Sequence, residues 1–112
     1  MSDNLASISA EAAVLGAMLI DGSVIDTVKD ILHKEAFTDS IHQKLYSVLV
    51  DLEYEDADLV LVRDEIANRK YDIPVDYLVK LTESTPITAN AEYYADIVLE
   101  KYKLRRLQGY AS

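Results

Sequence analysis

Two histidines are the side chains of this sequence with the widest chemical range, because imidazole can bind a metal ion or carry a proton near neutral pH. They are His33 and His42, and the carboxylates Glu35 and Asp39 lie between them. Together these four side chains could supply the ligands of a zinc site. Their spacing, however, fits neither HxxxH nor HExxH, and a turn is expected between the two histidines. We therefore interpret both as ordinary histidines at the surface or at helix ends.

A second group of possible metal ligands is a short acidic segment. Its members are Glu53, Glu55, Asp56 and Asp58. Calcium prefers oxygen ligands, but a calcium-binding loop also has a glycine turn and a bidentate glutamate at its far end. The segment lacks both features, so we interpret it as a solvated acidic loop.

Sequence motifs for catalysis are missing. There is no GxxxxGK(S/T) loop to hold a nucleotide phosphate, no GxGxxG, no GxSxG and no cysteine. We therefore expect no catalytic, cofactor-binding or metal-binding residue in this chain. A small enzyme is an alternative, but no constellation of nucleophile, base and oxyanion donors is visible.

The charges are numerous and unevenly placed. The formal net charge is −9, which repels a phosphate backbone and argues against direct nucleic-acid binding. Residues 51–76 carry nine acidic side chains against three basic ones, whereas Lys101–Arg106 carries four basic side chains and no acid. Such polarity could orient a protein partner. Alternatively, it is a solvated acidic face with cations that complement a helix dipole.

Length and composition indicate one domain outside the membrane. The 112 residues are 50% apolar, which is enough for a single core. The longest apolar run, Ala12–Ile20, is too short for a bilayer, which needs about 20 residues. The N-terminus carries no positive charge of the kind found in signal peptides, and the absence of cysteine fits a reducing compartment. We therefore expect a cytoplasmic protein.

The apolar spacing is helical nearly throughout, and it predicts an all-α compact bundle of about six helices. The expected helices run from about Ser9 to Ile20, Ser23 to His33, Ser40 to Glu53, Leu59 to Asn68, Pro74 to just beyond Leu81, and Ala89 to Leu107. The first helix is apolar nearly all round and should lie at the centre of the core. Gly16 inside it indicates the close approach of another helix.

Tyrosine is over-represented, with eight tyrosines against one phenylalanine and no tryptophan. In the last helix, we expect the buried stripe to consist of Tyr94, Ile97, Val98, Leu104 and Leu107. Tyr46, Tyr77 and Tyr94 could simply close the edge of the core. Three tyrosines lie off the stripe or beyond the packed elements, which makes them candidates for an interface: Tyr93, Tyr102 and Tyr110.

Four blocks of sequence, in order, resemble the N-terminal domain of DnaB-type replicative DNA helicases. Glu11–Asp21 reads EAAVLGAMLID and resembles the family's EQAVLGALLLD. After Phe37, residues 42–46 read HQKLY and resemble HQxIY. Residues 85–98 read TPITANAEYYADIV and resemble TPTTANAEYYAxIV, and Leu104–Leu107 matches LRxL. The family has a threonine cap before the fourth helix; that cap is absent here.

The resemblance covers about residues 7–108, and it implies a six-helix bundle whose last helix is the first arm of a helical hairpin. We expect a flexible N-terminus over residues 1–8, the helicase-like domain over 9–108, and the start of the hairpin turn or a linker over 109–112. At the fourth helix, Asp58 is expected to take the place of the missing cap.

The resemblance also implies a function without catalysis. In the family this domain belongs to a collar on the hexameric helicase ring, where it pairs with itself and docks primase or a helicase loader. ATP and Mg would belong to a C-terminal motor domain, and DNA would be contacted only through the parent helicase. A bacterial protein, or a phage protein in a bacterial host, is implied. Two alternatives share the fold: the helicase-binding domain of a primase, and a stand-alone phage or plasmid regulator.

The helical wheel of the last helix predicts which residues mediate self-association. The candidate interface residues are Tyr93, Leu99, Tyr102, Arg105 and Arg106.

Overall fold

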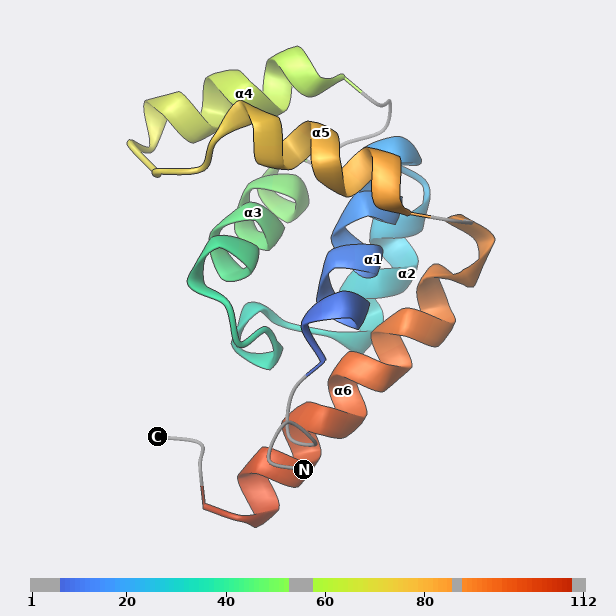
Figure 1. The fold of residues 1–112 in the computed structure, drawn as a ribbon. Helices are drawn as coiled ribbons and strands as arrows, with labels where there is room; N and C mark the ends of the chain where they lie inside the picture. The colour runs from blue at the N-terminus through green and yellow to red at the C-terminus, as the bar shows by residue number, and fades with distance from the viewer. Residues whose placement is uncertain (1–6, 53–57, 86–87, 110–112) are drawn as a thin grey trace.

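The computed structural model describes residues 7–52, 58–85 and 88–109, and this part of the chain contains helices and no strand. The elements are α1 (Ile8–Ile20), α2 (Val24–Ile31), the short 3-10 helix η2 (Lys34–Ala36), α3 (Ser40–Asp51), α4 (Leu59–Asn68), α5 (Val75–Ser84), the 3-10 helix η3 (Thr88–Asn90) and α6 (Ala91–Leu107). The prediction of an all-α bundle of about six helices is thus confirmed (Figure 1).

Helix α1 lies at the centre, as its all-round apolar surface predicts. The side-chain oxygen of Ser7 caps it by accepting a hydrogen bond from the amide of Ala10, so the helix begins at Ile8. Residues 14–19 are all buried. Helices α2, α3, α5 and α6 pack around α1.

The contact between α1 and α5 explains the glycine inside α1. A Cβ atom at Gly16 would lie 2.5 Å from the carbonyl oxygen of Leu81 and would also collide with the hydroxyl of Thr85. Because only a hydrogen atom fits there, the backbones of the two helices can approach closely. The predicted close approach at Gly16 is confirmed.

Three helix ends lie two residues from their predicted positions. Helix α3 ends at Asp51 instead of Glu53. Helix α2 ends at Ile31 instead of His33, because Leu32 has an extended backbone that leads into η2. This change of direction brings Ala36 and Phe37 into the core, where both are buried. Helix α6 begins at Ala91 instead of Ala89, since η3 precedes it.

The buried stripe of α6 also differs from the prediction. Ala91, Ala95 and Val98 are buried, whereas Leu107 is 82% exposed. Leu107 is exposed because α6 is long. At about 1.5 Å per residue the helix measures about 25 Å, so it extends beyond the helices beside it. Its last turn therefore projects from the body, as Figure 1 shows. Tyr102, in contrast, packs against the core instead of lying off the stripe.

The cap of α4 agrees with the prediction. One carboxylate oxygen of Asp58 accepts hydrogen bonds from the amides of Val60 and Leu61, at 3.0 and 3.4 Å. Val62 and Ile66 face the core, while Val60 and Leu61 are exposed. The predicted helix from Leu59 to Asn68 is therefore confirmed.

Candidate interaction surface

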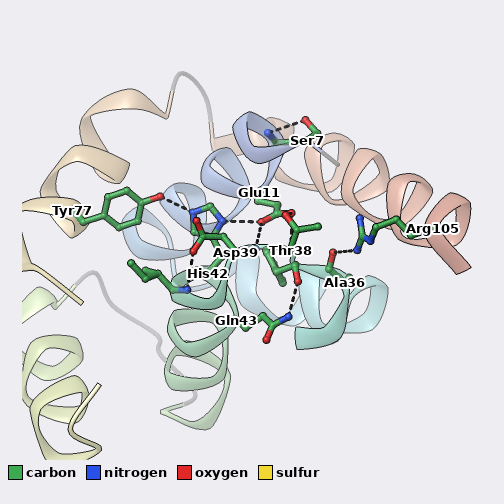
Figure 2. A network of polar contacts seen from close by, with 12 residues as sticks. Ser7, Glu11, Ala36, Thr38, Asp39, His42, Gln43, Tyr77 and Arg105 are labelled. Atoms are coloured by element: carbon green, nitrogen blue, oxygen red, sulfur yellow. Dashed lines mark hydrogen bonds and ion pairs between the residues drawn. The ribbon is translucent and has the colours of Figure 1, made fainter. Parts of the chain in front are cut away.

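A buried polar network joins three helices, and the sequence did not reveal it. Glu11 and His42 are 1% and 0% exposed, and the Nδ1 atom of His42 lies 2.8 Å from a carboxylate oxygen of Glu11. The Nε2 atom of His42 lies 2.6 Å from the hydroxyl of Tyr77 on α5 (Figure 2). His42 lies in the first turn of α3, which fits the helix-end interpretation, but it is buried and not at the surface; His33 is exposed as expected.

Hydrogen bonds favour the ionised form of the Glu11 carboxyl group. Besides His42, its carboxylate accepts hydrogen bonds from the amide and hydroxyl of Thr38, at 2.9 and 2.8 Å. Burial raises the pKa of Glu11, but these donors outweigh burial and the pKa lies below its usual value. A carboxylate accepts, so Nδ1 of His42 donates; in the neutral ring, Nε2 then accepts from the Tyr77 hydroxyl. Burial and the charges of Asp39 and Glu11 raise the pKa of Tyr77.

This network holds the helices together and does not form a reactive centre. The side chains of Glu11 and His42 are sealed from water, so no substrate reaches them. Among the described residues, no group of three or more histidine or acidic side chains is placed to hold a metal ion. Three members of the acidic segment, Glu53, Glu55 and Asp56, lie outside the described residues.

The predicted interface residues are spread along α6. Tyr93 is 65% exposed near the start of the helix, and its ring meets that of Tyr94 edge to face. Leu99 and Tyr102 are half-buried and pack against the core. Tyr102 also meets the ring of His33 edge to face, with centroids 5.1 Å apart. Tyr110 lies outside the described residues.

The two arginines that were predicted to lie at the interface differ in their surroundings. Arg105 donates a hydrogen bond of 2.9 Å to the carbonyl oxygen of Ala36, which ties α6 to η2 (Figure 2). Arg106 is exposed. Both guanidinium groups lie over the ring of Tyr102, at 5.6 and 5.9 Å from its centroid. Beside this ring is an open hollow lined by Tyr102, Lys103, Arg106 and Leu107.

The end of α6 therefore combines a tyrosine ring, an exposed leucine and several cations. Aromatic, arginine and apolar side chains of this kind are enriched at protein interfaces. The geometry offers a docking surface, and the chain carries no GxxxxGK(S/T) motif with which to hold a nucleotide.

Comparison with known proteins assigns the family. The family model described as "DnaB-like helicase N terminal domain" matches residues 3–100. The chain belongs to this family. The matched domain is the N-terminal, non-catalytic domain of the helicase.

Relatives in several bacteria support the assignment. The chain is 41% identical over 106 residues to the replicative DNA helicase DnaC of Bacillus subtilis and 42% identical over 106 residues to DnaB of Geobacillus stearothermophilus, with 90% of this chain and 23% of each relative covered. It also resembles the crystal structure of the N-terminal domain of DnaB helicase from Mycobacterium tuberculosis, with a TM-score of 0.86 and 38% identity. That match covers 92% of this chain and 77% of the other.

The chain spans about a quarter of the length of these curated relatives. Within the described part of the chain, no helix is both long and apolar enough to cross a membrane.

The buried pair is the feature that reasoning from the sequence missed. Glu11 and His42 are 31 positions apart, and local spacing carries no signal for a contact at that distance. The resemblance did hold a signal, because Glu11 opens the first matching block and His42 opens the second.

Proposed function

We propose that this domain serves as an interaction module of a replicative helicase, which associates with other copies of itself and docks primase or a helicase loader. The observation that carries the proposal is the match to the DnaB N-terminal domain in both sequence and structure. The exposed aromatic and basic residues of α6 support it, because they form a surface suited to protein contacts.

The parent protein would be an ATP-dependent DNA helicase that works in the cytoplasm of a bacterium or of a phage host. ATP and Mg would be bound by its motor domain, and that domain would contact DNA. The acidic charge of the present chain, −9, fits a role apart from DNA. In this arrangement the domain couples unwinding to priming by holding the primase at the ring.

A titration tests the docking role. The helicase-binding domain of the host's primase would be added to the isotopically labelled chain, and backbone NMR shifts would be followed. We expect shifts that cluster on one contiguous face. Unchanged spectra at millimolar primase, together with unchanged binding of primase when the domain is deleted from the parent helicase, would contradict docking.

Substitution on α6 tests the role in self-association. Tyr93→Ala, Tyr102→Ala and Arg106→Glu should each weaken self-association, whereas Lys29→Glu on α2 provides a matched change of charge elsewhere. If the α6 variants associate as the unchanged chain does, the α6 assignment is wrong even though the family assignment stands.

A further inference from the structure

The short segment that leads from η2 into α3 is held by side chains of three helices, and we name residues 36–39 the η2–α3 segment. The carbonyl oxygen of Ala36 accepts a hydrogen bond of 2.9 Å from the guanidinium of Arg105 on α6. The carbonyl oxygen of Phe37 accepts one of 2.7 Å from the side-chain amide of Gln43 on α3. Ala36 and Phe37 are both buried, so these bonds fix the first half of the segment inside the body.

The second half of the segment is bound to α1. The amide and the hydroxyl of Thr38 donate hydrogen bonds to the carboxylate of Glu11, at 2.9 and 2.8 Å. That carboxylate also accepts from His42, whose ring accepts from the hydroxyl of Tyr77 on α5. A series of contacts therefore runs from α6 through the segment to α5, and Figure 2 places Arg105 and Tyr77 at its two ends.

The buried part of this series depends on complete hydrogen bonding. Within the described part of the chain, every buried side-chain nitrogen and oxygen has a hydrogen-bond partner. Glu11 is 1% exposed, and a buried carboxylate is tolerated only while donors surround it. If the segment moved away, Glu11 would lose the two donors of Thr38 and would have to rearrange around His42. A displacement at one end of the series is therefore passed on to the next contact.

At its outer end the series depends on a contact that a partner can reach. Arg105 is only partly buried, and its guanidinium also lies 5.6 Å from the centroid of the Tyr102 ring. Tyr102 in turn meets the ring of His33, just before η2, edge to face. The acceptor at Ala36 is a neutral carbonyl, whereas a carboxylate forms a stronger, charge-assisted hydrogen bond with a guanidinium. A carboxylate brought to this part of α6 therefore competes with Ala36 for Arg105.

We propose that Arg105 couples the outer half of α6 to α5, and that a protein partner with a carboxylate on its surface operates this coupling. While the guanidinium binds Ala36, the η2–α3 segment is fixed and Thr38 donates to Glu11. When the partner's carboxylate takes up the guanidinium, the segment opens and the link to Tyr77 on α5 weakens. The inference rests on the proposed function in one respect, that partners contact α6.

An intramolecular carboxylate tests the competition without a partner. Lys101 precedes Arg105 by four residues, so Lys101→Glu places a carboxylate beside the guanidinium, in the favourable order for an ion pair on a helix. Lys103→Glu makes the same change of charge on the same helix, but residues two apart do not face each other. Lys103→Glu is therefore the matched control. Circular dichroism checks that both variants stay folded.

The measurement is amide hydrogen exchange of the chain, followed by NMR. In Lys101→Glu, we expect the amide of Thr38 to exchange at least about tenfold faster, because its hydrogen bond to α1 opens with the segment. The amide of Leu78 on α5 should exchange about threefold faster. Lys103→Glu should change both rates by less than about twofold. The amide of Ile66 is the reference, because none of the side chains in the series comes from α4, and its rate should stay the same.

Two substitutions of arginine show whether Arg105 is the group that responds. Arg105→Met removes the guanidinium and should reproduce both accelerations. In that background Lys101→Glu should change neither rate further, since there is no guanidinium to withdraw. Arg106→Met removes the neighbouring exposed guanidinium, which also lies over the Tyr102 ring, and should leave both rates within about twofold of those in the unchanged chain.

Three results would overturn the proposal. One is equal acceleration at Ile66 and Leu78, which would show a general loss of stability in place of a coupling. Another is an equal effect of Lys101→Glu and Lys103→Glu. The third is an Arg105→Met variant in which Thr38 exchanges at the unchanged rate. All are measured on the chain without a partner, so a failed coupling leaves the proposed function standing, and the primase titration decides docking separately.

Discussion

Glu11 occupies the first turn of α1, where a carboxylate is favoured by the helix dipole even when it faces water. In this protein the same side chain is 1% exposed, and its carboxylate accepts hydrogen bonds from Thr38 and His42. An ionised group is tolerated in a core only when its hydrogen-bonding capacity is met. Thr38 and His42 meet that requirement from the loop before α3 and from α3 itself.

Glu11→Gln tests how much the hydrogen bonds of Glu11 contribute to the stability of the fold. The substitution keeps the size of the side chain but replaces one acceptor oxygen with a donor group and removes the charge. We expect the free energy of unfolding to fall by about 3 kcal/mol, because His42 and Thr38 would lose a buried acceptor. Urea denaturation measures this free energy of unfolding. Glu92→Gln, in the exposed first turn of α6, is the matched control and should cost less than about 0.5 kcal/mol. Equal effects of the two substitutions would show that the network contributes nothing special.

The lowered pKa of Glu11 also predicts a dependence of stability on pH. The native pKa lies below the ordinary value of 4.5, so the folded state holds the proton less tightly than the unfolded state. The resulting stabilisation is complete above about pH 6 and is lost as the pH falls below 4.5 toward the native pKa.

The difference in unfolding free energy between the unchanged chain and Glu11→Gln isolates this contribution. It should be constant between about pH 6 and 7 and should shrink below about pH 4.5, and urea denaturation at each pH follows it. Other carboxylates titrate in both proteins and cancel in the difference. A difference that grows on acidification would contradict the assigned direction of the pKa.

At the scale of elements, the packing of α1 against α5 depends on the absence of a side chain at Gly16. Alanine is the better helix former by about 1 kcal/mol, so local propensity alone predicts that Gly16→Ala stabilises the protein. We expect the reverse, a loss of about 2 kcal/mol, because the new methyl group would push against the carbonyl oxygen of Leu81 and force the helices apart. Thermal or urea denaturation decides between the two signs.

Two further variants show which contact is responsible for the effect of Gly16→Ala. Gly16→Ala combined with Thr85→Ala removes the clash with the threonine hydroxyl but leaves the Leu81 carbonyl and the Cβ of residue 85, so only part of the loss should be recovered. Gly109→Ala is the control: nothing lies within 4 Å, and its positive φ of 79° alone accounts for a cost of about 1 kcal/mol. A stabilising Gly16→Ala would mean that the helices separate at little cost.

The elements themselves were predictable because apolar residues recur at helical spacing throughout the chain. The errors fall where a distant contact overrides the local pattern. Helix α2 stops early since Phe37 must reach the core, and His42 is buried because Glu11 and Tyr77 approach it from two other helices. Local sequence signals do not specify such contacts. At the candidate site, the sequence pattern placed Tyr93 and Arg106 on the surface, but not Tyr102 against His33.

At the scale of the molecule, α6 has two parts with different roles, one in the core and one at the surface. Its first half, with Ala91, Ala95 and Val98 buried, closes the core. Its second half begins with Tyr102 against His33 and Arg105 bound to the Ala36 carbonyl, and ends in a turn that touches little of the body. Stability and association should therefore be separable along one helix.

Two truncations test this division. A chain that ends after Arg106 loses Leu107, which is 82% exposed, so its free energy of unfolding should change by less than about 0.5 kcal/mol. A chain that ends after Val98 also loses Leu99, Tyr102 and Arg105, and it should lose about 3 kcal/mol or more of stability with their packing. Urea denaturation measures both. Truncation after Arg106 should nevertheless weaken self-association, because it removes the exposed Leu107 from the helix predicted to form the interface and nothing from the core. If stability and association fell together in the Arg106 truncation, the last turn of α6 would be part of the folded body and the proposed division would be wrong.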